Sequence, residues 1–167
     1  YLVPSGGKIT LNGSASGTTP ITYIWNASAG AFDNYQSPTP VYTAPAFAAG
    51  TIINLSLLAT NSAGSNTASA VLTLTDIVTI TSSVYKTTKK ILTITAKSSS
   101  TSAVLKLMPY LTTGASIYDP SLLGNTFKLS KGVWSLTLTG VPQPAGGTLL
   151  TAGLQVKSSL GGVSPKT

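Results

Sequence analysis

Apolar and polar residues alternate along this chain in short runs, the period of a β-strand with one buried and one solvated face. Residues 21–25, 52–58 and 70–75 show the pattern in the first half of the sequence. Turn-forming residues separate the runs, among them Asn12-Gly13 and the cluster at 61–64. Helical periodicity is nearly absent. The pattern therefore predicts an all-β protein, a sandwich or barrel of short strands.

The same alternation places strands along the whole chain. In the first half we expect strands near 8–16, 21–27, 41–43, 51–60 and 67–75. In the second half we expect them near 77–85, 90–97, 103–109, 126–129, 133–139, 149–157 and 162–166. Each half has one tryptophan inside an alternating run, Trp25 and Trp134. A large ring at such a position packs between two sheets, so we expect both tryptophans to be core anchors.

The few charged residues, 8% of the chain, are lysines and aspartates, and the sequence has no glutamate, arginine, histidine or cysteine. General acid–base catalysis usually needs a histidine or a tuned carboxylate, and metal sites need His, Cys or clustered carboxylates. We therefore expect no enzyme activity, no cofactor and no metal site. No apolar run reaches the roughly 20 residues that cross a bilayer as a helix, so we also expect no transmembrane segment.

The net charge of +7 is unevenly divided along the sequence. Residues 1–76 carry Lys8 against Asp33 and Asp76, a net charge of −1. Residues 77–167 carry the other nine lysines against Asp119, a net charge of +8. Such asymmetry favours two separate units. We expect domains at 1–76 and 77–167, joined without a linker rich in Gly, Pro or Ser.

The first half resembles a known family in the order and spacing of four segments. They read GKITLNGSAS at 7–16, PITYIW at 20–25, VYTAP at 41–45 and LLATNSAG at 57–64. Together they resemble the polycystic-kidney-disease (PKD) domain over residues 4–76. That resemblance implies an immunoglobulin-like β-sandwich. The acidic cluster and Gly-Asp-Gly that the family often carries are absent here, so no calcium site is carried over.

The second half resembles a repeat module of bacterial secreted proteins. The similarity lies in VTITSSVY at 78–85, KILTITA at 90–96, Trp134 in its strand, and SSLGG at 158–162. It implies a second immunoglobulin-like sandwich and display outside the cell. The fold class expected for the chain is therefore all-β, with two tandem immunoglobulin-like β-sandwiches.

Two sets of side chains are candidates for modification or ligand contact. Asn12, Asn26 and Asn54 each begin an Asn-x-Ser sequence that can accept an N-linked glycan. A group of lysines flanks a predicted turn in the basic half and is a candidate contact for an anionic polymer, or a guard against pairing of an edge strand. This group consists of Lys86, Lys89 and Lys90.

The function we expect is that of a non-catalytic extracellular protein, structural or adhesive, at a cell surface. A weakly charged, hydroxyl-rich surface favours assembly with copies of itself into a fibre or surface layer. The halves of −1 and +8 favour head-to-tail contact, which propagates into filaments. The apolar segment Tyr1, Leu2, Val3 is the candidate assembly strand, added to an open sheet edge of a neighbouring copy.

Two alternatives stay open. One is an accessory module of a larger secreted enzyme that binds carbohydrate or another polymer, such as surface polysaccharide. Its platform would be exposed tyrosines: Tyr35, Tyr42, Tyr110 and Tyr118. The other is a phage decoration protein. No specific nucleic-acid contact is expected, because the chain lacks the arginines that grip phosphate with two hydrogen bonds.

Overall fold

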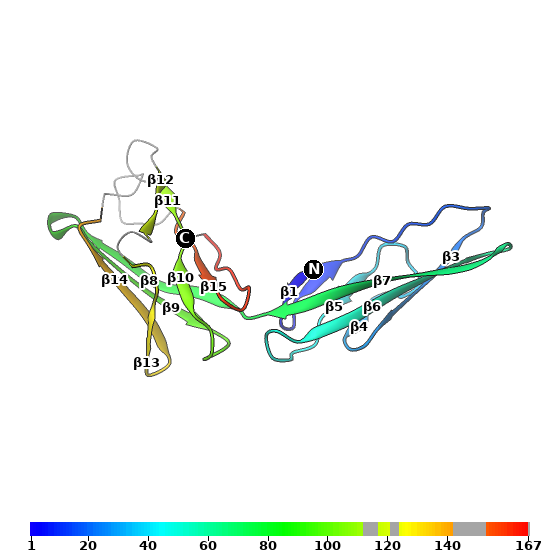
Figure 1. Cartoon of the computed structure of the whole chain (residues 1–167), viewed down its shortest axis with the longest axis horizontal. Coiled ribbons are helices and arrows are strands. Elements are labelled where there is room, and N and C mark those ends of the chain that lie inside the picture. The colour runs from blue at the N-terminus through cyan, green and yellow to red at the C-terminus, as the bar shows by residue number, and fades with distance from the viewer. Residues whose placement is uncertain (112–116, 121–123, 142–152, 167) are drawn as a thin grey trace. The chain divides into compact units, whose positions relative to one another are not determined.

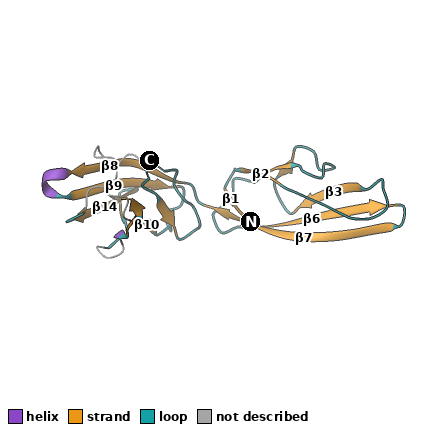
Figure 2. Ribbon diagram, turned by 90° about the horizontal axis from the view of Figure 1, so that it is seen from above, coloured by secondary structure: helices purple, strands orange, loops and turns teal. Residues whose placement is uncertain are grey.

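The computed structural model describes residues 1–111, 117–120, 124–141 and 153–166. It divides the chain into two compact units, Tyr1–Thr75 and Asp76–Thr167, which we call the first and second domains. Regular structure is almost entirely β-strand (Figure 1), with a short 3-10 helix, η1 (Thr87–Lys89), in the β8–β9 connection (Figure 2). The all-β prediction is therefore confirmed.

The first domain contains seven strands in two sheets. The strands are β1 (Leu2–Pro4), β2 (Lys8–Thr10), β3 (Thr22–Ala27), β4 (Ala31–Phe32), β5 (Val41–Thr43), β6 (Ile52–Asn61) and β7 (Gly64–Thr75). One sheet has the order β1-β7-β6-β3 and the other the order β2-β5-β4. In chain order, the third, sixth and seventh strands share one sheet, and the second, fourth and fifth share the other. This is the immunoglobulin-like division.

The core of the first domain lies between these two sheets. Trp25 on β3 is buried and donates its indole N–H to the carbonyl oxygen of Ser37 at 3.0 Å. Phe32 contacts the rings of both Trp25 and Tyr42, with centroid separations of 6.3 and 5.2 Å. Gly13 lies so close that a Cβ there would be 2.8 Å from the Trp25 ring. Burial of this aromatic row, with Val3, Leu55 and Leu72, holds the sheets together.

Strand β2 ends at Thr10, six residues before the predicted end at 16. Beyond it, Leu11 and Gly13 still donate their N–H groups to the carbonyl oxygens of Pro40 and Pro38. The prolines have no N–H to return, so the ladder is bonded in one direction only and regular pairing stops. By contrast, β7 begins at Gly64 and not near 67, because the cluster at 61–64 closes a tight hairpin.

The second domain also consists of two main sheets. Its strands are β8 (Val78–Lys86), β9 (Ile91–Ser98), β10 (Leu105–Leu107), β11 (Tyr110–Leu111), β12 (Ile117–Tyr118), β13 (Lys128–Ser130), β14 (Val133–Thr139) and β15 (Val156–Ser158). The larger sheet has the order β13-β14-β9-β8, and β10 pairs with β15 in the facing sheet. Val163 adds an isolated bridge to Lys157. With β11 and β12 set apart as a small pair, this order matches the four-plus-three division of the immunoglobulin fold.

A buried apolar cluster fills the second domain, and Trp134 on β14 belongs to it. The predicted strand at 149–157 is observed only as β15, and its residues 149–152 lie outside the described residues. The last predicted strand, near 162–166, is reduced to the bridge at Val163. Tyr85 connects β8 to the segment that follows β14, because its hydroxyl donates to the carbonyl oxygen of Val141 at 2.7 Å.

Asp76 belongs to the second domain, and this changes the charge of both units. Its side chain is 1% exposed and accepts hydrogen bonds from the Ser98 hydroxyl at 2.6 Å and the Gly162 N–H at 3.0 Å. In Tyr1–Thr75 only Lys8 and Asp33 remain, so those side chains sum to zero. The second domain then carries the whole formal charge of +7. The expected opposite charges of the two halves are therefore absent.

Candidate interaction surfaces

The outer face of sheet β1-β7-β6-β3 contains four of the seven large hydrophobic residues that are exposed in the first domain: Leu2, Ile24, Ile52 and Val71. Strand register places Leu2, Thr73 and Ile52 in one row across β1, β7 and β6. Val71 follows in the next row, beside Asn54. Leu2, Ile52 and Val71 are 65%, 60% and 52% exposed, so these three side chains form a solvent-facing patch.

This sheet face contains no charged side chain. Beyond the patch, its outward positions on β3, β6 and β7 are filled by hydroxyl, amide and further apolar residues. They are Thr22, Ile24, Asn26, Ser56, Leu58, Thr60, Ser65, Thr67 and Ser69. Large exposed apolar patches on soluble domains usually mark contact sites. Sequence periodicity predicted the long strands, but it does not give their register, which places Leu2 and Ile52 on either side of Thr73.

The segment expected to be an assembly strand is paired within its own domain. Leu2–Pro4 forms β1, which runs parallel to β7 with Val3 opposite Leu74. The amino group of Tyr1 donates to the Val71 carbonyl oxygen at 3.1 Å, and Val3 is 2% exposed in the core. Donation of this strand to a neighbour would first remove Val3 from the core. Leu2 instead belongs to the exposed patch, and the side chain of Tyr1 is exposed as well.

All three candidate glycosylation asparagines are exposed. Asn26 on β3 and Asn54 on β6 lie on the uncharged outer face, while Asn12 lies in the loop after β2. Asn26, Asn54 and Val71 together line a shallow hollow of about 470 Å³. A glycan on either would cover the apolar patch. Glycosylation itself stays a prediction.

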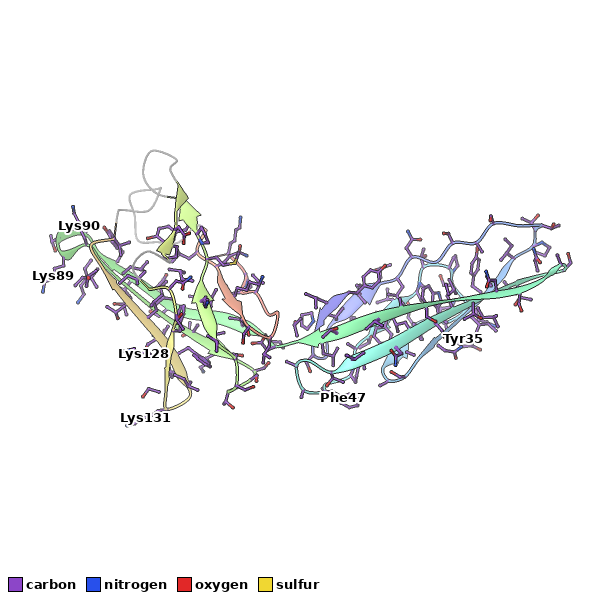
Figure 3. All side chains as sticks on the ribbon, viewed as in Figure 1. Tyr35, Phe47, Lys89, Lys90, Lys128 and Lys131 are labelled. Atoms are coloured by element: carbon purple, nitrogen blue, oxygen red, sulfur yellow. The ribbon has the colours of Figure 1, made fainter. Side chains whose placement is uncertain are left out.

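Lys86, Lys89 and Lys90 surround η1 at the β8–β9 turn, as Figure 3 shows for the last two. All are exposed, and Lys90 has the left-handed backbone conformation that closes the turn. Lys128 and Lys131 lie at the β13–β14 turn, which the register places at the opposite end of the same sheet. The two groups therefore do not form one patch.

A further pair of lysines, which sequence reasoning missed, lies on the other sheet of the second domain. Lys106 on β10 is directly opposite Lys157 on β15, and both are exposed. Like charges in directly opposite positions of an antiparallel pair are destabilising. The sequence alone does not predict this lysine pair, because the two residues are 51 positions apart. Only the pairing of Leu105–Leu107 with Val156–Ser158 brings them together.

The expected platform of exposed tyrosines is wrong for two of its members. Tyr42 is fully buried, and its hydroxyl donates to the Ala29 carbonyl oxygen, while Tyr110 is 4% exposed. Burial raises the pKa of the Tyr42 hydroxyl above its ordinary value. Tyr35 is half exposed (Figure 3), and the side chain of Tyr118 lies outside the described residues. Of the three tyrosines in this set whose side chains are described, Tyr35 is the one that is exposed.

The described residues contain no group of three or more metal-binding side chains of the His, Cys, Asp or Glu type. Asp33 has a structural role, since its carboxylate accepts the backbone N–H groups of Asn34 and Val41 at 2.6 and 2.8 Å. Among the helices in the described part of the chain, none has the length and apolar character of a membrane span.

No protein-family model and no curated protein matches this chain. Solved structures are similar to it at low identity. A titin I-band fragment, I67–I69, is 14% identical with a TM-score of 0.40, over 98% of this chain and 60% of that one. Titin domains z1z2 in complex with telethonin are 16% identical, with a TM-score of 0.36 over 98% and 89%.

A structure described as the basis of Dscam isoform specificity is 12% identical with a TM-score of 0.36, and its alignment covers 98% of this chain and 41% of that one. At TM-scores below 0.5 we draw no functional conclusion from any of these likenesses. The fold is assigned instead from the strand order within each domain. The chain consists of immunoglobulin-like β-sandwich domains.

Proposed function

We propose that this protein is a non-catalytic extracellular structural or adhesive subunit that associates with copies of itself through its first domain. The observation that carries the proposal is the uncharged outer face of sheet β1-β7-β6-β3, with Leu2, Ile52 and Val71 exposed at the end of the sheet where β1 pairs with β7. A surface fibre or layer at the cell exterior is the assembly we favour. The resemblance of the second half to repeat modules of bacterial secreted proteins supports an extracellular setting.

Charge also favours contact through the first domain. Its side chains sum to zero, whereas two second domains of +7 repel each other. Head-to-tail attraction between opposite charges no longer supports assembly, because the first domain has no net negative charge to offer. Apolar burial is then the remaining driving force, at about 25 cal/mol for each Å² of apolar surface removed from water.

Sedimentation velocity of the full chain over a range of concentrations tests the proposal. The informative variant is Val71→Lys, and its matched control is Val84→Lys, at an exposed valine of β8 in the second domain. We expect Val71→Lys to weaken association by at least about tenfold, because a lysine in the contact must be desolvated. Val84→Lys should leave it nearly unchanged. A wild-type chain that stays monomeric at every concentration would refute the proposal.

A second candidate function rests on the lysine pair of the second domain. Lys106 and Lys157 place two ammonium groups side by side, at a cost in stability that an anionic polymer such as acidic polysaccharide would offset. Retention on a heparin-like resin in low salt tests it, with Lys106→Ser/Lys157→Ser compared against Lys89→Ser/Lys90→Ser. Earlier elution of the first double variant alone supports a site at the pair; equal shifts indicate attraction by overall charge.

Negative-stain microscopy of the native material separates the remaining alternatives. Filaments or sheets support the self-assembling subunit. Particles on a capsid lattice would support a phage decoration protein, and dispersed monomers would leave the polymer-binding accessory module.

A further inference from the structure

Strand β7 has an edge that its own domain covers only in part. β6 pairs with β7 from Gly64 to Thr73, but on the other side β1 pairs only with Thr73, Leu74 and Thr75. The N–H of Thr73 donates to the Tyr1 carbonyl oxygen, and the Val71 carbonyl oxygen accepts from the Tyr1 amino group. Odd-numbered residues of β7 thus direct their backbone groups toward the β1 side.

Three residues continue that edge beyond β1: Ser65, Thr67 and Ser69. In the first domain, where every residue is described, their outward backbone groups have no backbone partner. The Thr67 N–H donates only to the side-chain oxygen of its neighbour Asn66, at 2.8 Å in an exposed local bond that a second strand can replace. A row of N–H and C=O groups without backbone partners is a template for another strand.

Proteins usually protect such edges with lysine, proline or a bulge. The second domain shows these devices, since its edge strand β8 has a bulge between Ile80 and Ser82 and ends in Lys86. Residues 64–71 of β7 read GSNTASAV, with no charge and no proline, and they pair with β6 without a shift in register. This edge is therefore unguarded.

Space beside the edge lets a second chain approach. An open groove of about 770 Å³ is lined by the loop at 14–16 and by the β6–β7 hairpin, including Ser65 and Thr67 of the edge. Leu57 and Ala68 line it from the sheet side and Ser14 from the loop side. Figure 1 shows the hairpin of β6 and β7 extending along the first domain to this end.

We infer that β7 pairs antiparallel with β7 of a second copy, centred on Thr67, so that one sheet runs through both first domains. The edge is self-complementary in this register: Thr67 faces Thr67 of the second copy, and Ser65 faces Ser69. Each of these pairs exchanges two backbone hydrogen bonds. In this register hydroxyl residues face each other on the outer side of the sheet and Asn66 faces Ala68 on the other side, with no like charges opposed. This inference rests on the proposed self-association and adds to the uncharged face a second contact of the first domain, the edge of β7 in the same sheet.

Cysteine cross-linking of the full chain tests this register, since the sequence contains no cysteine of its own. A Thr67→Cys variant places two thiols across the twofold axis, at a Cα separation near 5.5 Å that suits a disulfide. The matched control is Thr22→Cys, at an exposed threonine on β3 of the same sheet face. We expect Thr67→Cys to form covalent dimers at least about tenfold faster, because pairing raises the effective thiol concentration.

Mixing Ser65→Cys with Ser69→Cys should cross-link the two variants to each other faster than either variant to itself. Thr67→Pro gives a second readout, because it removes an N–H that points away from β6 and so should abolish dimers while preserving the β-sheet circular dichroism. Equal cross-linking of Thr67→Cys and Thr22→Cys in a chain that does associate overturns edge pairing and leaves the proposed function standing. A chain that never associates overturns both.

Discussion

Substitution of Trp25 by alanine isolates the contribution of one side chain to the first domain. The ring is 8% exposed, packs against Phe32 and Gly13, and donates a hydrogen bond to Ser37. Removing a buried tryptophan costs about 3–5 kcal/mol, and the unpaired Ser37 carbonyl adds about 1 kcal/mol. A domain of this size is stable by only about 4–11 kcal/mol, so we expect Trp25→Ala to leave it marginally folded or unfolded.

The chain supplies its own control for this measurement. Trp25 and Trp134 are its two tryptophans, one in each core, so in the Trp25→Ala variant all indole fluorescence reports on the second domain. Urea unfolding should then show an unchanged Trp134 transition, while circular dichroism reveals an early loss of about half the β-structure. Trp25→Phe, which keeps a ring in place, should cost about 1–2 kcal/mol. A first-domain midpoint equal to that of the wild type would refute the placement of Trp25 in the core.

Two further substitutions test buried polar groups. Because burial raises the pKa of Tyr42 in the folded chain, the Tyr42 hydroxyl ionises first in the unfolded chain, near pH 10. The contribution of the neutral Tyr42 hydroxyl to stability is therefore complete below that pH, and it is lost as the pH rises toward the pKa in the folded chain. Tyr42→Phe should lower the stability of the first domain by about 1 kcal/mol at neutral pH and reduce the further loss at alkaline pH. If the first-domain urea midpoint falls equally in the wild type and in Tyr42→Phe between about pH 9 and 11, the reasoning is contradicted. In the second domain, Asp76→Ala leaves the buried Gly162 N–H unpaired and should cost about 2–4 kcal/mol of stability. Asp76→Asn keeps an acceptor for that N–H and should cost less than about 1 kcal/mol. Equal decreases in the melting temperature of the two variants would show that the hydrogen bonds of Asp76 do not stabilise the domain.

Sequence periodicity predicts the long strands of this fold and misses several of the short ones. The bounds of β14 agree with the expected 133–139, and β3 begins one residue after the expected 21–27, because alternation over a long run with turn residues on both sides is unambiguous. Strand β1 could not be found this way, since three residues carry no period and their partner lies some seventy positions away. Likewise, the three-residue run of β5 does not say which face Tyr42 takes, and the structure buries it.

The candidate surfaces were less predictable than the fold, because they depend on register and on single residues at a boundary. The patch of Leu2, Ile52 and Val71 exists only once three strands are aligned. The assignment of Asp76 depended on its hydrogen bonds to Ser98 and Gly162, which no local pattern indicates. That one residue decides whether the first domain is acidic or neutral, and hence which force can hold two copies together.

The salt dependence of self-association tests the central claim most directly. Sedimentation equilibrium of the full chain at about 50 mM and 500 mM salt separates the two forces, because ions screen exposed charges and leave apolar burial intact. If copies meet through the neutral first domain, association stays constant or strengthens as the repulsion between second domains of +7 is screened. Association that disappears at the higher salt concentration would contradict the account, because it would mean that attraction between charged groups holds the copies together.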